Sequence, residues 1–223
     1  MSSSKKTADS LKSEIVRAKE IFARLKKEYP SVRIALDFTT PFELLVATIL
    51  SAQCTDARVN IVTKTLFKKY TSPKDYLKVS NEELEKDIYS TGFYKQKAKS
   101  VKQCCQALID HHNGKVPDDF EALENLPGVG RKTASVVAGN AFGIPAIAVD
   151  THVKRISNRL GFIDSEDPFK IEMRLKELFP QKDWVYTTHY LITHGRKICA
   201  AKRPHCIQCV VGDLCPSFNP NFE

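Results

Sequence analysis

The feature that most constrains the fold is a series of helix starts with no strand pattern between them. Three reciprocal capping patterns, in which Thr, Ser or Asp stands three residues before Glu, open helices at Thr40, Ser80 and Asp118. Apolar residues recur at helical spacing through eight segments: 11–27, 42–52, 57–70, 95–112, 133–142, 151–160, 169–178 and 184–199. Because no segment alternates as a half-buried strand does, we expect an all-α fold.

The connections between these segments are short. Turns are expected at Ser72-Pro73, Gly92, Asn113-Gly114 and Gly143-Ile-Pro145, and neither a low-complexity linker nor an internal repeat is visible. A chain of 223 residues therefore forms one large core or two interlocked lobes.

The charge balance favours an anionic partner. Lys and Arg number 34 against 26 Asp and Glu, a net charge of +8, so nucleic acid is the first candidate, beside a protein that is merely soluble and basic. The longest strongly apolar stretch, 44–50, is far shorter than the ~18–20 residues of a membrane span, and the N-terminus has no secretory core. We expect no membrane association and a cytoplasmic location, at the nucleoid if the source is prokaryotic.

Four of the seven cysteines lie close together near the C-terminus. Cys199, Cys206, Cys209 and Cys215 form the pattern C-x6-C-x2-C-x5-C, which is typical of a metal centre in a reducing compartment. Zinc and an iron–sulfur cluster both accept four thiolates, but structural zinc sites usually combine two C-x2-4-C pairs, and only one is present. The spacing therefore favours a cluster. The other three cysteines, Cys54, Cys104 and Cys105, fall in helical segments and are expected to be ordinary apolar or half-buried thiols.

Basic residues accompany the cysteines. Arg196 and Lys197 precede Cys199, and Lys202 and Arg203 lie between the first two cysteines. They could simply balance the thiolate charge. Lys202 and Arg203, inside a tethered loop, could also contact phosphates.

The stretch LPGVGRKTA, Leu126 to Ala134, predicts a tight hairpin that opens a helix. Gly128 and Gly130 permit positive φ and close approach, and the helix after Gly130 offers unpaired N–H groups and its positive dipole end. Such a helix start is a seat for a phosphate, although a lone G-x-G is more often a plain turn between helices.

Two residues near this hairpin could carry chemistry. Lys132, beside Arg131 in the first helical turn, is either an amine nucleophile or an ordinary phosphate contact or solvated charge. Asp150, in AVDTHVKR, ends an apolar stretch and begins a helix, which is also the usual place of an N-cap.

Taken together, LPGVGRKTA, AVDTHV, ILSAQCTD and the cysteine spacing resemble the endonuclease III family of bifunctional DNA glycosylases and abasic-site lyases, which belong to the helix-hairpin-helix superfamily. The match spans about residues 10 to 216, and the combination is far more specific than any one motif.

The resemblance implies that an oxidised pyrimidine is flipped out of duplex DNA and removed. Lys132 would attack the sugar to form a Schiff base, Asp150 would stabilise positive charge on the sugar, and β-elimination would cut the strand on the 3′ side. Gln53 matches the residue that fills the vacated stack, and Phe93 an apolar wedge on the opposite strand. Gln53 could instead cap a helix, and Phe93 could pack inward.

The resemblance also implies an architecture. A six-helix lobe would span 32–143, and residues 1–31 and 144–223 would form a discontinuous lobe with a 4Fe-4S cluster on the four cysteines. We expect a monomer that binds double-stranded DNA containing damaged bases or abasic sites.

Two other functions fit part of the pattern. A monofunctional glycosylase, such as the adenine glycosylases that act on mismatches, would share the hairpin and cluster but lack the lysine. A noncatalytic iron–sulfur protein or DNA-binding module would not need Lys132 and Asp150 together.

Overall fold

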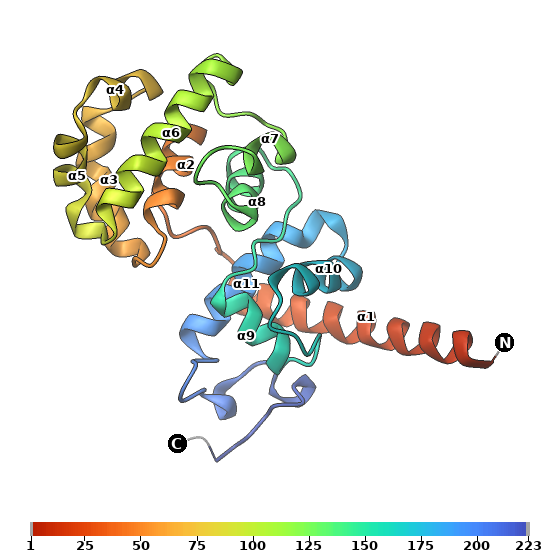
Figure 1. Cartoon of the computed structure of the whole chain (residues 1–223). Helices are drawn as coiled ribbons and strands as arrows, with labels where there is room; N and C mark the ends of the chain where they lie inside the picture. The colour runs from red at the N-terminus through yellow and green to blue at the C-terminus, as the bar shows by residue number, and fades with distance from the viewer. Residues whose placement is uncertain (1, 222–223) are drawn as a thin grey trace. The chain divides into compact units, whose positions relative to one another are not determined.

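The computed structural model describes the backbone of residues 2–221 and the side chains of residues 10–221. Over these residues the chain consists of helices joined by turns and contains no strand, which confirms the all-α expectation (Figure 1). It divides into two compact units, 34–144 and the pair 1–33 with 145–223. Among the described helices, none combines the length and apolarity needed to cross a membrane.

The unit 34–144 contains seven α-helices rather than the expected six. The number six comes from the family resemblance, and two of the seven helices, α4 and α7, contain only six and five residues. The helices are α2 (Pro41–Leu50), α3 (Asp56–Lys69), α4 (Pro73–Lys78), α5 (Asn81–Ile88), α6 (Tyr94–His112), α7 (Phe120–Glu124) and α8 (Arg131–Ala141), with a 3₁₀ turn η1 (Tyr89–Thr91).

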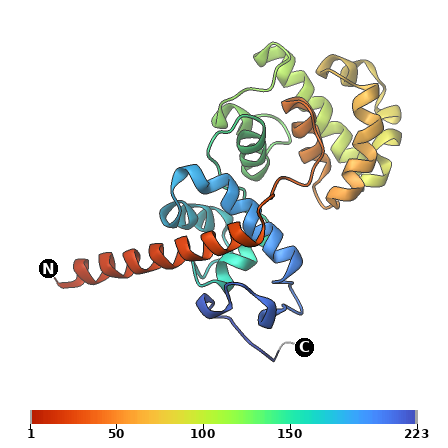
Figure 2. The same cartoon turned by 180° about the vertical axis from the view of Figure 1, so that it is seen from behind.

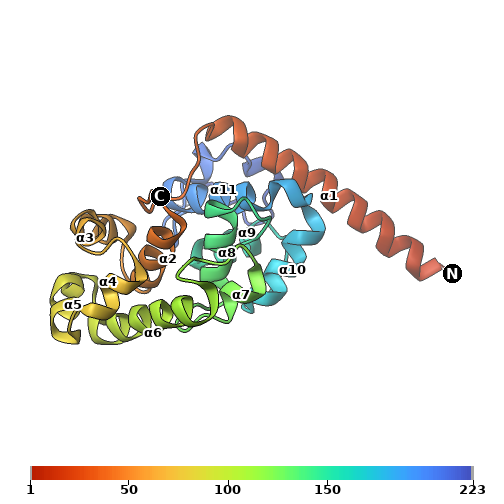
Figure 3. The same cartoon turned by 90° about the horizontal axis from the view of Figure 1, so that it is seen from above.

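Helix α2 forms the centre of this unit. All residues from Leu44 to Leu50 are buried, as expected for a helix that is apolar on every side. It packs against α3, α6 and α8, while the long helix α6 runs beside α4 and α5 (Figure 3). Helix α8 is therefore held by the core of the unit through Ala134, Val137 and Ala138.

The other unit is built from both ends of the chain. Its helices are α1 (Ser2–Glu28), α9 (Thr151–Arg159), α10 (Pro168–Leu178) and α11 (Trp184–Lys197), with 3₁₀ turns η2 (Gln181–Asp183), η3 (Cys206–Gln208) and η4 (Gly212–Leu214). Helix α1 packs against α10 and α11 (Figure 2). It buries Ala18, Ile21 and Leu25, which share one helical face, in a core with α9, α10 and α11.

The predicted helix starts meet different outcomes. The capping box at Thr40 is confirmed, since Glu43 N–H donates to Thr40 Oγ1 at 3.1 Å and Thr40 N–H donates to the Glu43 carboxylate at 3.3 Å. Ser80 caps α5 through Glu83 N–H at 3.1 Å, while the Glu83 carboxylate pairs with Lys69 at 2.6 Å.

The prediction at Asp118 is wrong by one residue. The N-cap is Asp119, whose carboxylate accepts from Ala122 N–H at 2.8 Å, because α7 begins at Phe120.

Ser72-Pro73, expected to be a turn, begins α4 instead. The Asp75 carboxylate accepts from Ser72 N–H at 3.0 Å and from its hydroxyl at 2.8 Å, and Pro73 occupies the first turn. Cys54 was expected in a helix but lies in the turn between α2 and α3. Helix α11 ends at Lys197, so Cys199 belongs to the following loop.

Candidate functional site

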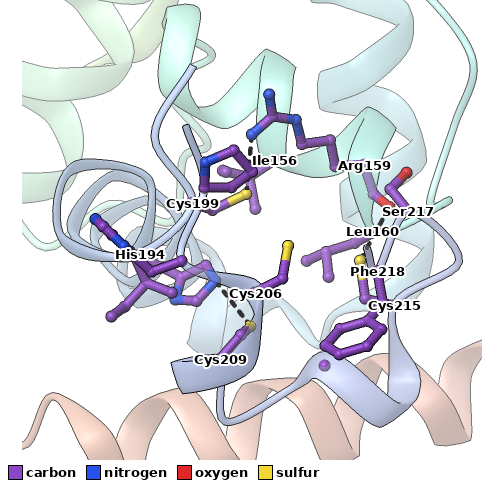
Figure 4. Close-up of a pocket in the computed structure, with 14 residues that line it drawn as sticks. Ile156, Arg159, Leu160, His194, Cys199, Cys206, Cys209, Cys215, Ser217 and Phe218 are labelled. Atoms are coloured by element: carbon purple, nitrogen blue, oxygen red, sulfur yellow. Dashed lines mark hydrogen bonds between the residues drawn. The ribbon is translucent and has the colours of Figure 1, made fainter. Parts of the chain in front are cut away.

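Four thiols surround one cavity in the unit formed by the chain ends. Cys199, Cys206, Cys209 and Cys215 are half-buried, take part in no disulfide and line a cavity of about 160 Å³. Figure 4 shows their sulfur atoms directed toward a common space. No three His, Cys, Asp or Glu side chains in the described part of the chain are arranged to hold a single metal ion.

Successive three-residue turns shape this loop. Cys209 N–H donates to the Cys206 carbonyl at 3.0 Å, Gly212 N–H to that of Cys209 at 3.0 Å, and Cys215 N–H to that of Gly212 at 3.1 Å. A turn of this kind returns a side chain to the same side every third residue. Three of the four thiols therefore share one side of the loop.

A side chain from α9 supports the first thiol. Arg159 NH1 donates to Cys199 Sγ at 3.3 Å and to the Ala200 carbonyl at 2.7 Å, and its NH2 donates to the Ala201 carbonyl at 2.7 Å. One guanidinium thus fixes both the thiol and the backbone that follows it.

A buried histidine contacts another thiol. His194 Nε2 lies 3.6 Å from Cys209 Sγ, and its Nδ1 lies 3.1 Å from the Tyr29 hydroxyl. Burial lowers the pKa of His194 to about 4 and raises that of Tyr29 to about 12, so the imidazole is neutral and the tyrosine keeps its proton. In the tautomer in which the Tyr29 hydroxyl donates to Nδ1, the imidazole proton is on Nε2, toward Cys209.

The bare thiols resist ionisation. Burial, reinforced by the neighbouring thiols, raises the pKa of Cys209 to about 11 and also raises that of Cys215. A positively charged centre among them would reverse this effect, because thiolates are the form that binds metal.

The hairpin lies in the other unit, between α7 and α8. Leu126 and Val129 are buried, and Val129 N–H donates to the Leu126 carbonyl at 3.0 Å, which closes the turn. Gly128 has φ +76°, and a Cβ there would lie 2.8 Å from Ser100 Cβ, so glycine is required. Gly130 has φ −92° and open space around it, so it uses neither the positive φ nor the close approach that glycine permits. As the N-cap without a side chain, Gly130 leaves the first amides of α8 accessible to an external anion.

The two basic residues after the hairpin differ. Lys132 is exposed in the first turn of α8 and makes no hydrogen bond or ion pair with the described residues. Arg131 NH1 lies 3.3 Å from Glu124 Oε2, and its guanidinium lies 5.2 Å from the Phe120 ring centroid. Arg131 thus ties α8 to α7, whereas the Lys132 amine is available.

Asp150 begins α9 in the unit formed by the chain ends. Its Oδ1 accepts from Val153 N–H at 2.8 Å, so it is an N-cap, and its side chain is half-buried. The bond fixes the carboxylate by one oxygen.

Gln53 and Phe93 occupy exposed turns of the hairpin-bearing unit. Their φ angles are +52° and +48°, a left-handed conformation that is uncommon for non-glycine residues. Phe93 is 65% exposed and therefore does not pack inward. The Gln53 side chain is exposed and forms no hydrogen bond with the described residues, so the structure gives it no capping role.

Lys202 and Arg203 project from the loop between Cys199 and Cys206. Both are exposed, and the loop is closed by His205 N–H, which donates to the Ile198 carbonyl at 2.9 Å. Of the two cations expected before Cys199, Lys197 lies over the Tyr29 ring at 5.3 Å.

The contacts of Arg159 and His194 with the thiols were not expected from the sequence. His194 stands five residues before Cys199, which is a weak signal of its contact with Cys209. Arg159 lies 40 residues before Cys199 and carries no local signal, because its contact depends on the packing of α9.

Comparison with known proteins identifies the family. Residues 46–181 match the model of the HhH-GPD superfamily base excision DNA repair protein. The chain is 50% identical over 202 residues to "Endonuclease III" of Synechocystis sp., covering 90% of this chain and 92% of that protein. It is 43% identical over 196 residues to "Endonuclease III" of Escherichia coli K12, covering 88% and 93%.

A solved structure is similar over the same extent. It is described as a trapped endonuclease III–DNA covalent intermediate, an estranged-adenine complex, and it matches with a TM-score of 0.88 and 48% identity, covering 91% of this chain and 96% of that one. The chain belongs to the endonuclease III family within the HhH-GPD superfamily.

Proposed function

We propose that this protein is a bifunctional DNA glycosylase and abasic-site lyase that removes oxidised pyrimidines from duplex DNA. The observation that carries the proposal is the available Lys132 amine, in the first turn of a helix whose N-cap is Gly130. Its relatives include endonuclease III of Synechocystis sp., and a similar structure contains endonuclease III joined covalently to DNA. A monofunctional glycosylase would lack this lysine.

Lys132 provides the nucleophile. Its amine forms a bond to sugar C1′ as the bond from C1′ to the base breaks, and the base leaves with a proton. Loss of the amine proton and opening of the sugar ring give a protonated Schiff base. This cation acts as an electron sink: C2′ loses a proton, the C3′–O bond breaks and the 3′ strand leaves with a 5′-phosphate. Water then releases Lys132.

Asp150 is proposed to stabilise the positive charge that develops on the sugar and to assist proton transfer. The hydrogen bond from Val153 N–H supports this role, because it holds the carboxylate in one orientation without using its second oxygen.

DNA contacts are assigned to three kinds of residue. The amides after Gly128 and Gly130 seat a phosphate at the start of α8, with Arg131 beside them. Gln53 fills the space left by the flipped nucleotide, and Phe93 wedges against the opposite strand; their exposure supports both roles. Lys202 and Arg203 contact backbone phosphates.

The four-thiol cavity is assigned to a 4Fe-4S cluster held by Cys199, Cys206, Cys209 and Cys215. The donor set is entirely thiol and lines one cavity, and the sequence contains a single C-x2-C pair where structural zinc sites usually combine two. When bound, the cluster ties this loop together through four metal–sulfur bonds. Arg159 supports the arrangement by donating to Cys199 Sγ, and His194 Nε2 lies beside Cys209 Sγ.

Borohydride trapping tests the catalytic assignment. Lys132→Gln should bind a duplex with an abasic site but form no trapped adduct and leave the strand intact. Asp150→Asn should remain folded, because Asn caps a helix about as well as Asp, yet its rate should fall ~10²–10⁴-fold. Lys115→Gln, an exposed lysine of the same unit, serves as the control and should trap normally.

Duplexes with different oxidised pyrimidines, run in parallel, report substrate choice. An adduct formed by Lys132→Gln would assign the nucleophile to another amine, and full activity of Asp150→Asn would leave the aspartate as a cap only.

A further inference from the structure

A lysine is buried in the hairpin-bearing unit. Lys97, in the first turn of α6, is 5% exposed, and burial lowers its pKa. Its Nζ donates to the Thr91 carbonyl at 2.7 Å and forms no ion pair with the described residues. Lysine is rarely buried without a carboxylate partner, since removing an ammonium from water is costly. The hydrogen bond to Thr91 therefore calls for an explanation.

The Thr91 carbonyl belongs to the turn that presents Phe93. Thr91 is 2% exposed, and its hydroxyl donates to the Ile88 carbonyl at 2.8 Å. Gly92 and Phe93 then follow with φ +70° and +48°, two left-handed residues in succession. A phenylalanine adopts this conformation only where its surroundings enforce it. Phe93 N-caps α6, and its carbonyl accepts from Lys97 N–H at 3.0 Å.

Lys97 thus holds both sides of this turn. Its side chain fixes the carbonyl before Gly92, and its backbone N–H fixes the carbonyl of Phe93. Between these two points the Phe93 ring remains 65% exposed instead of collapsing onto the apolar core.

We propose that Lys97 is a positioning residue that keeps Phe93 in its left-handed, exposed conformation, ready to stack against DNA. This inference rests on the proposed function, in which Phe93 enters the duplex. Lys97 itself is buried and does not need to touch DNA; it acts through the turn.

Helix α6 contains a matched control. Lys102 also donates Nζ to a single backbone carbonyl, that of Val79, but this carbonyl precedes α5 and lies outside the turn of Phe93. Replacing either lysine by Met removes one ammonium–carbonyl bond from the same helix. Lys97 is buried and Lys102 half-buried, so the control matches the helix and the type of bond but not the burial. Loss of such a bond occurs in both variants, whereas positioning of Phe93 is specific to Lys97.

The test is a double-mutant cycle between Lys97→Met and Phe93→Ala in the full-length protein. Binding is measured on a duplex with a tetrahydrofuran abasic-site analogue, which cannot form a Schiff base. Phe93→Ala should weaken binding about 5- to 150-fold, as expected for loss of one stacked aromatic residue. Lys97→Met should weaken it to a similar extent, and the double variant should be no weaker than Phe93→Ala within about threefold.

The experiment also includes the Lys102→Met control and a measurement of the strand-cleavage rate. Lys102→Met should bind like the unchanged protein, and its effect should simply multiply with that of Phe93→Ala. With saturating natural abasic-site DNA, Lys97→Met should retain its single-turnover cleavage rate. If Lys97→Met does not fold by circular dichroism, Lys97→Gln takes its place, since its side chain is one bond shorter than that of lysine and carries no ammonium.

Several outcomes would overturn the inference. They are multiplicative effects of Lys97 and Phe93, unchanged binding by Lys97→Met, or an equal loss in Lys102→Met. None of these outcomes bears on the proposed chemistry of Lys132. Unchanged binding by Phe93→Ala would contradict both the wedge role of Phe93 and its positioning by Lys97. Borohydride trapping through Lys132 in the same variant would show that the catalytic proposal still holds.

Discussion

Unusual backbone conformations mark individual residues that the sequence pattern associates with DNA. Among the described non-glycine residues, only Gln53, Phe93 and Asn113 have positive φ. Asn113 has an ordinary explanation, because it ends α6 and Asn tolerates the left-handed conformation. Gln53 and Phe93 stand in exposed turns and have no such explanation. Strain of this kind persists where the surrounding structure enforces it and is frequent at ligand-binding positions.

The cluster assignment predicts the metal content. Purified protein should be yellow-brown and contain about four iron and four sulfide per chain, measured by chemical analysis and absorption. Cys206→Ser should lose most of both, because it removes one ligand. Cys104→Ser, which changes a buried thiol of α6, should retain them. Stoichiometric zinc without iron or sulfide in protein prepared anaerobically would contradict the assignment.

Among the secondary-structure elements, the hairpin between α7 and α8 depends on close backbone approach at one glycine only. Gly128 lies against Ser100 of α6, so the hairpin turn is seated on the longest helix of its unit. No neighbouring atom would contact a Cβ at Gly130. The role of Gly130 is to leave the first amides of α8 uncovered. The two glycines of the motif therefore have separate physical roles.

This separation predicts different consequences for the same substitution. Gly128→Ala should reduce the free energy of unfolding by about 2–4 kcal/mol, from the left-handed conformation and the contact with Ser100. Gly130→Ala should cost less than about 1 kcal/mol, because its backbone is extended. Urea denaturation of the two variants provides the measurement. The prediction fails if the two costs are equal, or if Ser100→Gly does not lessen the cost of Gly128→Ala.

For the molecule as a whole, a net charge of +8 attracts DNA of any sequence. The cysteine loop concentrates part of this charge, since Arg159 binds the carbonyls just before Lys202 and Arg203 and thereby limits where they can point. A general attraction and a local phosphate contact can be distinguished by their dependence on salt.

Lys202→Ala or Arg203→Ala should weaken binding to damaged and undamaged duplexes alike. Each should reduce the slope of log affinity against log salt by about one unit, because one phosphate contact is lost. Lys170→Ala, an exposed lysine of α10, lowers the net charge equally and should change the slope much less. Equal slopes for all three variants would show that net charge alone is responsible. Iron content should be unaffected in each.

Several features could be predicted from the sequence because they depend on local chemistry. The cap at Thr40 and the spacing of the thiols depend on neighbours nearby in the chain, so local patterns were enough to predict them. The requirement for glycine at position 128 instead comes from Ser100 of α6. The short helix α4 was not predicted, since its six residues are too few for a periodic pattern, whereas the capping pattern located the start of α7 to within one residue.

Only the tertiary structure decided which distant groups meet. The bond of Arg159 to Cys199, the contact of His194 with Tyr29 and the joining of α1 to residues 145–223 link positions 40 to more than 100 residues apart. The burial of Lys97 and its bond to the Thr91 carbonyl likewise depend on packing. Such contacts form because burial of apolar faces brings whole helices together. Polar side chains on these helices then form hydrogen bonds with the groups that packing places beside them.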